Sequence, residues 1–366
     1  MSDPEISRPT PPLPPPQPPT MRPQPPRKKK RGFFGGCLLV FVILLSLIGA
    51  GTVVFAISVG SLAKSAPDAI YRATTKPQRD VNQSYVQVGD RKQKIVIIPV
   101  HGIIQNGAGG RYAAPSEMLI DFLKEAREQK VGAVILDLNT PGGEMTATDE
   151  VYHELLKLRE AGIPTVSCMR SVCASGGYYL AAGTDHIIAN RLTFTGSIGV
   201  IMGGINYGKL LERWDIKPEV YKSGELKDFM NMSRERSERE AAMVQGMIDE
   251  AFLEFAQVVA DGRGELEVAA ILEGPIGDAG VFSGTRALEL KLVDELGYLE
   301  DAIDKAAELA GFDDPSVVRY GSMPGLLDSL LGAKAAPPSL QQLIAPAHAA
   351  IKPGQLYFLC PIGLLK

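Results

Sequence analysis

Short, dense apolar runs alternate with stretches of helical spacing between residues 92 and 315 of the chain. Runs such as KIVIIPVHG and GAVILDLN are rich in Val and Ile, as strands buried on both faces of a sheet should be. On this basis, strands are predicted at 94–102, 132–139, 164–169, 186–191, 197–202 and 219–224. Helical spacing predicts helices at 116–130, 146–162, 237–264 and 299–311. This alternation implies right-handed crossovers, and therefore an α/β fold with a mainly parallel sheet and helices on both faces.

The longest apolar stretch lies nearer the N-terminus, where residues 32–63 contain no charged side chain. About 20 apolar residues suffice to cross a bilayer, so one transmembrane helix is predicted here, roughly from Phe34 to Val59. A cleaved signal peptide is the competing interpretation, but its apolar region would be only about 7–15 residues long. The basic run RKKKR before the span indicates a cytoplasmic N-terminus, with residues beyond about 65 on the outer side of the membrane.

The chain is accordingly divided into five parts: a Pro-rich basic cytoplasmic tail at 1–31, a transmembrane anchor at 32–63, a linker at 64–92, an α/β domain at 93–315 and an irregular C-terminal tail at 316–366. A helical arm is predicted inside the α/β domain at about 233–312. Twelve of the 27 prolines lie in residues 4–26, and such a segment favours extended polyproline II conformers over a packed core.

Charge and metal-ligand patterns exclude two classes of function. The formal net charge is -4, but residues 1–31 carry seven Lys or Arg against two acidic residues, so the rest of the chain sums to about -9. An acidic body of this kind argues against nucleic-acid binding. The four cysteines and four histidines show no zinc-ligand spacing, so neither a metal site nor a cofactor is predicted.

The segment SVCASGGYYLAAG contains the candidate nucleophile, Ser175. It follows the strand predicted at 164–169, and ligands of open α/β sheets collect at the carboxyl ends of strands. The competing interpretation is that Ser175 only caps a helix, since Ser is among the commonest N-cap residues. A catalytic serine also needs a base that accepts its proton.

Two residue types supply candidates for that base. A histidine triad is possible with one of His101, His153, His186 and His348, but none of them lies in a Gly-rich active-site signature. Lysine serves as a base only when neutral, a state that burial favours. The lysine candidates form one cluster around VYKSGELKDFMN: Lys217, Lys222 and Lys227.

An acyl-transfer enzyme also needs donors for the oxyanion, usually two backbone N–H groups. The segment NTPGG supplies a Gly-rich turn after the strand at 132–139, and Gly142 and Gly143 leave their amides unshielded. A plain strand-to-helix loop explains this turn equally well when it is taken alone. Its predicted position on the strand next to ASGG is what suggests a shared site.

Five motifs in this order resemble the signal peptide peptidase A family in its short, single-copy form. They are NTPGG (139–143), ASGGYYLA (174–181), TGSIGV (195–200), YKSGELKD (221–228) and FSGTRALELKLVDELG (282–297). The resemblance covers roughly residues 92–315 and implies that 93–315 is a peptidase domain. It also implies a superhelical βαβ core related to the Clp protease and crotonase superfamily.

The resemblance implies a role for each site residue. Ser175 would be the nucleophile, Lys227 the general base, and Ser197 the residue that orients the lysine. The oxyanion donors would be the amide of Gly176 and that of either Gly142 or Gly143, a choice that stays open. Two departures from the family pattern, Lys291 in place of a common Gly and GDAGVFSG without the usual Arg, concern the packing of the arm.

The function implied is that of a membrane-anchored serine endopeptidase, which cleaves released signal peptides and other hydrophobic peptide segments through an acyl-enzyme. The family also implies a homo-oligomer in which neighbouring subunits complete each other's sites, and a catalytic domain on the outer or periplasmic side of the cell membrane. Whether serine and lysine meet within one chain stays open. The alternatives are a crotonase-like acyl-CoA enzyme and a non-enzymatic membrane scaffold.

Overall fold

A nine-stranded, mainly parallel sheet organises the part of the chain that the computed structural model describes, residues 81–107, 113–322 and 356–359. Its continuous path is β1 (Val81–Gln87), β12 (Pro315–Ser322), β2 (Asp90–His101), β5 (Ala133–Thr140), β7 (Thr165–Ala174), β8 (His186–Ala189) and β11 (Glu295–Leu296). Neighbours on this path are parallel, except that β1 is antiparallel to β12. The predicted α/β class is confirmed.

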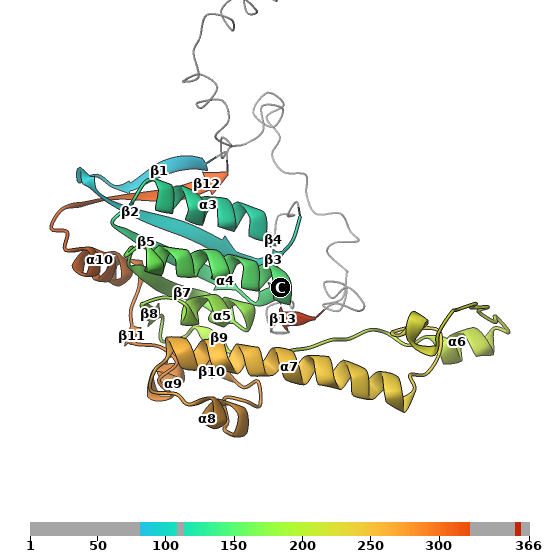
Figure 1. The fold of residues 1–366 in the computed structure, drawn as a ribbon. Coiled ribbons are helices and arrows are strands. Elements are labelled where there is room, and N and C mark those ends of the chain that lie inside the picture. The colour runs from blue at the N-terminus through green and yellow to red at the C-terminus, as the bar shows by residue number, and fades with distance from the viewer. Residues whose placement is uncertain (1–80, 108–112, 323–355, 360–366) are drawn as a thin grey trace, which may run out of the picture. The chain divides into compact units, whose positions relative to one another are not determined.

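Helices cover both faces of the sheet because its central strands are apolar on both sides (Figure 1). In β2, Val96 and Ile98 pack with α3 (Ser116–Glu128), α4 (Met145–Glu160) and α5 (Gly176–Ala182). Their sequence neighbours Ile95 and Ile97 face the opposite way and pack with α10 (Leu299–Ala310). All four side chains are fully buried, as expected of a parallel strand that lies between two helical layers.

Two strands of the main sheet lie wholly or mostly outside the predicted boundaries of the domain. Strand β1 occupies part of the predicted linker, and β12 occupies the start of the predicted irregular tail. Strand β12 inserts between β1 and β2, where Val317 and Val318 are buried on opposite faces. Since the partners of β12 lie more than 200 residues earlier in the chain, local spacing gave no sign of this pairing.

Two predicted strands are replaced by other structure. The run at 197–202 is preceded by the short strand β9 (Phe194–Gly196), which pairs with β7 and with β10 (Val281–Ser283). The run at 219–224 forms no strand, and all of its residues are exposed. Because no strand pairs with it, its adjacent apolar residues Val220 and Tyr221 have no sheet in which to be buried.

The arm is built on α7 (Glu238–Gly262), which begins with a capping box between Ser237 and Glu240. The second half of α7 packs on α5, where the rings of Phe255 and Tyr179 lie 5.1 Å apart. The first half extends towards α6 (Gly208–Arg213), as Figure 1 shows, and the 3-10 helix η1 (Glu225–Asp228) follows α6 in the chain. The predicted arm at 233–312 therefore differs from the observed one, since α10 belongs to the sheet.

The short helices α8 (Val268–Glu273) and α9 (Gly284–Glu289) follow α7. The membrane span predicted at 32–63 lies outside the described residues. Among the residues that are described, no helix has both the length and the apolar character that crossing a membrane requires.

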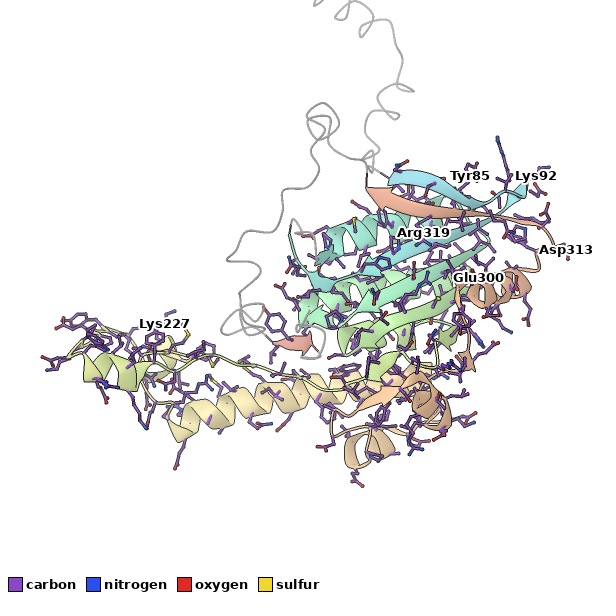
Figure 2. All side chains as sticks on the ribbon, turned by 180° about the vertical axis from the view of Figure 1, so that it is seen from behind. Tyr85, Lys92, Lys227, Glu300, Asp313 and Arg319 are labelled. Carbon is purple, nitrogen blue, oxygen red and sulfur yellow. The ribbon has the colours of Figure 1, made fainter. Side chains whose placement is uncertain are left out.

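A buried carboxylate ties the sheet together on the face that carries α10. Asp137 of β5, which is 1% exposed, accepts hydrogen bonds from Arg170 of β7 and from Arg319 of β12, the latter at 2.6 Å. Figure 2 labels Arg319 on this rear face. Burial alone would raise the pKa of Asp137, but hydrogen bonds from His101 and the two arginines hold that pKa well below its usual range.

We expect Asp137→Asn to destabilise the full-length protein by about 3 kcal/mol at pH 7, because two part-buried guanidinium groups lose their shared charge partner. A carboxylate whose pKa is depressed by folding stabilises the protein above about pH 4 and loses that contribution as the pH falls. The difference from the parent should therefore shrink below about pH 4. Urea unfolding at several pH values tests this, with the exposed Asp304→Asn on α10 as control; equal curves for the two variants would contradict it.

Candidate active site

Ser175 occupies the turn between β7 and α5 and has an unusual backbone conformation. Its φ of 54° and ψ of -118° lie where a residue with a side chain is strained. Its N–H donates to the carbonyl of Gly196 at 2.8 Å, which holds the turn against β9. The residue stands at the N-cap position, yet its side chain makes no capping hydrogen bond. Capping therefore does not explain this serine.

The hydroxyl of Ser175 has no hydrogen-bond partner among the described residues, although the residue is only 1% exposed. An unpaired hydroxyl in a strained turn calls for a functional reason, because strained residues cluster at active sites. A nucleophile that waits for a base and a substrate is such a reason.

The turn NTPGG lies directly beside Ser175. Thr140 at the end of β5 pairs with Cys173 of β7, two residues before the serine. A Cβ on Gly177 would lie 2.7 Å from the methyl carbon of Thr140, so the two turns pack together only because a side chain is missing there. The predicted proximity of the two Gly-rich segments is therefore observed.

Strand β6 (Gly142–Glu144) continues from this turn and packs even more closely. A Cβ on Gly143 would lie 1.8 Å from the carbonyl oxygen of Ile104 in β3 (Ile103–Gln105). The amide of Gly142 donates to the hydroxyl of Thr140 at 3.1 Å. The amide of Gly176 opens α5, where the first N–H groups of a helix have no partner within the helix.

Ser197 lies close to Ser175 but on a separate turn. It follows Gly196, the residue whose carbonyl accepts the Ser175 amide, and it too has a positive φ, 51°. Its own N–H donates to the carbonyl of Gly280 at 2.7 Å, and the residue is 7% exposed. Two strained serines thus border the same end of β7 and β9.

Lys227 is not brought to this place within the chain. It lies in η1 at the far end of the arm, exposed and well away from the sheet in Figure 2. The other candidate bases do not replace it. Lys217 and Lys222 are paired with Asp215 and Asp228, and in the described part of the chain no histidine contacts Ser175.

Residues 357–359 form a strand between β6 and Ile201, and the place that this strand fills is here called the groove. Strand β13 (Tyr357–Leu359) pairs antiparallel with β6, so that Leu359 lies opposite Gly142 and Phe358 opposite Gly143. On its other side, Tyr357 exchanges backbone hydrogen bonds of 3.0 and 3.1 Å with Ile201. An extended peptide is therefore held between two backbones next to the Gly-rich turn.

This strand was not anticipated in the sequence, where 316–366 was expected to be irregular. A signal was present, since the run QLYFL combines aromatic and branched residues that favour strands. A strand of three residues is too short to be assigned without its partners, which here lie more than 150 residues away.

A strained serine beside a Gly-rich turn that pairs with an extended strand fits a serine endopeptidase, and known proteins agree with this class. Residues 157–313 match the model of peptidase family S49. The putative signal peptide peptidase SppA of Enterococcus faecium is 35% identical over 263 residues, covering 70% of this chain and 76% of its own. The putative protease slr0021 of Synechocystis is 39% identical over 226 residues, covering 62% of this chain and 78% of its own.

The chain belongs to peptidase family S49 and, within it, to the signal peptide peptidase A family. The resemblance found in the sequence is thereby confirmed, and so is the prediction of a serine endopeptidase. The roles of individual site residues stay predictions.

We expect Gly143→Ala to lower peptide hydrolysis by more than tenfold, because the new methyl group would push β6 away from Ile104 and open the groove. Stability should fall by about 1–3 kcal/mol. Gly246→Ala in α7 is the matched control, since no atom lies within 4 Å of its new Cβ and the change favours the helix. Initial rates and thermal unfolding of the full-length variants test this; a Gly143→Ala enzyme with parental rates would contradict it.

Proposed function

We propose that the protein is a membrane-anchored endopeptidase with a Ser175–Lys227 dyad, which cleaves released signal peptides and other hydrophobic segments. Neutral Lys227 takes the proton of the Ser175 hydroxyl as the oxygen attacks a peptide carbonyl. The amide of Gly176 and one from Gly142 or Gly143 bind the oxyanion. The proton passes to the leaving amine, and water then hydrolyses the acyl-enzyme.

The observation that carries this proposal is the strand β13 beside the Gly-rich turn. It supports an extended polypeptide as the natural ligand, bound by strand addition between β6 and Ile201. A crotonase-like enzyme would need the same space for an acyl-CoA thioester, and a scaffold would not need a strained serine. The two alternatives therefore explain less of the site.

The position of Lys227 supports a dyad formed between subunits. The end of the arm exposes several large apolar side chains, including Tyr221 at 90%, Trp214 at 72% and Ile205 at 66%. Exposed apolar residues gathered in this way are typical of a protein–protein contact. A neighbouring copy that covers them would place Lys227 of one chain near Ser175 of the next, which makes a homo-oligomer part of the proposal.

Membrane anchoring rests on the sequence. The uncharged run at 32–63 and the basic residues before it support a single span with a cytoplasmic N-terminus and a catalytic domain on the outer side. A site held near the bilayer would meet hydrophobic peptides such as signal peptides. The name of the Enterococcus faecium relative, a putative signal peptide peptidase, agrees with this substrate class.

We expect Ser175→Ala and Lys227→Ala each to lower hydrolysis of a quenched hydrophobic peptide by at least about a thousandfold. If the dyad forms between chains, co-assembling the two inactive variants should restore activity in about one site in four, because each site needs one intact residue from each of two chains. Lys217→Ala, on the same arm, is the control and should keep the parental rate.

Two results separate the parts of this proposal. Full activity of Lys227→Ala would refute the dyad. If the two single variants are inactive and stay inactive after co-assembly, the dyad does not form between chains. The dyad would then have to form within one chain, through a rearrangement of the arm.

We also expect removal of residues 356–366 to lower KM for a peptide substrate several-fold, with little change in kcat. A tethered segment competes with substrate at a high effective concentration, and its loss frees the groove. Truncation after residue 359, which keeps β13, is the matched control. Identical KM values for the two truncated enzymes would contradict the competition.

A further inference from the structure

Four charged side chains form a cluster at the end of the arm, next to Lys227 in the chain. This arm cluster consists of Lys222, Asp228, Arg234 and Glu240. Its two carboxylates are withdrawn from water, with 14% of the Asp228 side chain and 2% of the Glu240 side chain exposed. The surrounding residues of the arm are mostly exposed, so these two less exposed carboxylates indicate that the cluster has a specific role.

Arg234 lies at the centre and binds both carboxylates at once. Its guanidinium donates to the two oxygens of Asp228 at 2.9 and 3.2 Å, and to the two oxygens of Glu240 at 2.6 and 2.8 Å. Glu240 also closes the capping box with Ser237 at the start of α7. The cluster therefore joins the turn that carries Lys227 to the rigid end of a 25-residue helix.

Lys222 fixes the same turn from the other side. Its ammonium group donates to the carbonyl of Glu225 at 2.9 Å and to the carboxylate of Asp228 at 2.7 Å. Both ends of η1 are thus held by cations. Hydrogen bonds from Arg234 and Lys222 also keep the pKa of Asp228 well below its usual range, and those from Arg234 lower the pKa of Glu240 to about 2.

Lys227 itself is left without a partner among the described residues. Its sequence neighbour Asp228 is the nearest carboxylate along the chain and would pair with it if its oxygens were free. Such a pair would hold the lysine back and favour its charged form, which cannot act as a base. The side chain of the other acidic residue of η1, Glu225, is 66% exposed, so a pair between it and Lys227 would be weak.

From this geometry we propose that Arg234 is a positioning residue for the base: it anchors the Lys227 turn to α7 and keeps the Asp228 carboxylate away from the Lys227 amine. This inference rests on the proposed dyad and adds a second requirement to it. The lysine must be held firmly enough to reach a partner's serine, and it must also remain unpaired until it arrives.

The test compares full-length enzymes over a range of pH. We expect Arg234→Gln to lower kcat at neutral pH by roughly tenfold or more with KM changed less than about twofold, because the base is displaced while the groove is intact. The rising limb of the kcat–pH profile should move to higher pH by about one unit, since the released carboxylate favours the charged lysine.

Three further variants make the result specific. The double variant Arg234→Gln/Asp228→Asn should return the limb to the parental pH while kcat stays low. Arg234→Lys should have a kcat between those of Arg234→Gln and the parent, because a lysine ammonium group cannot form bidentate hydrogen bonds with two carboxylates at once. Arg239→Gln breaks another ion pair between α7 and η1, the one with Glu225. Both side chains of this pair are more than 60% exposed, so kcat and the pH profile should stay parental.

A parental pH profile for Arg234→Gln, or equal effects of Arg234→Gln and Arg239→Gln, would overturn the inference. Lys227→Ala is measured in parallel. If it is active, the dyad itself is wrong; if it is inactive while Arg234→Gln behaves as the parent, only the positioning role is wrong. Should Arg234→Gln fail to fold, Arg234→Lys against Arg239→Gln supports the inference if only the former loses kcat and overturns it otherwise.

Discussion

The close approach of backbone segments at the ends of β5 and β7 is the constraint on which the rest of the site depends. Gly143 touches the carbonyl of Ile104, and Gly177 touches Thr140, at distances that no side chain would allow. These contacts determine the position of β6 relative to the turn that carries Ser175. They thereby determine where a peptide strand lies, which amides face it, and how far the strained Ser175 is from the peptide bond.

The arm obeys a different constraint. A helix of 25 residues is about 37 Å long, and only its second half packs on α5. Its first half can therefore hold a residue far from the sheet, and the arm cluster ties that remote turn to the start of α7. The two residues of the proposed dyad are thus divided between a sheet edge and a remote turn, an arrangement that suits assembly of several chains.

Local patterns in the sequence were sufficient for the central sheet and the motifs. The Val- and Ile-rich runs gave β2, β5, β7 and β8, and the order NTPGG then ASGG gave the proximity of the two turns. The features that the sequence did not predict are contacts between distant parts of the chain. The pairing of β12 with β1 and β2, the ion pairs of Asp137 with Arg170 and Arg319, and the seating of β13 all join residues more than 30 positions apart. The segment at 219–224 failed for the opposite reason, because a locally strand-like run has no neighbour to pair with.

The insertion of β12 between β1 and β2 affects when the chain can fold during its synthesis. Strand β12, which lies between β1 and β2, is synthesised more than 200 residues after them, so a growing polypeptide cannot complete the sheet until residue 322 has emerged. Peptide-bond hydrolysis is dangerous to other unfinished chains nearby. A sheet that is completed by so late a strand ties the appearance of that chemistry to the completion of the sheet.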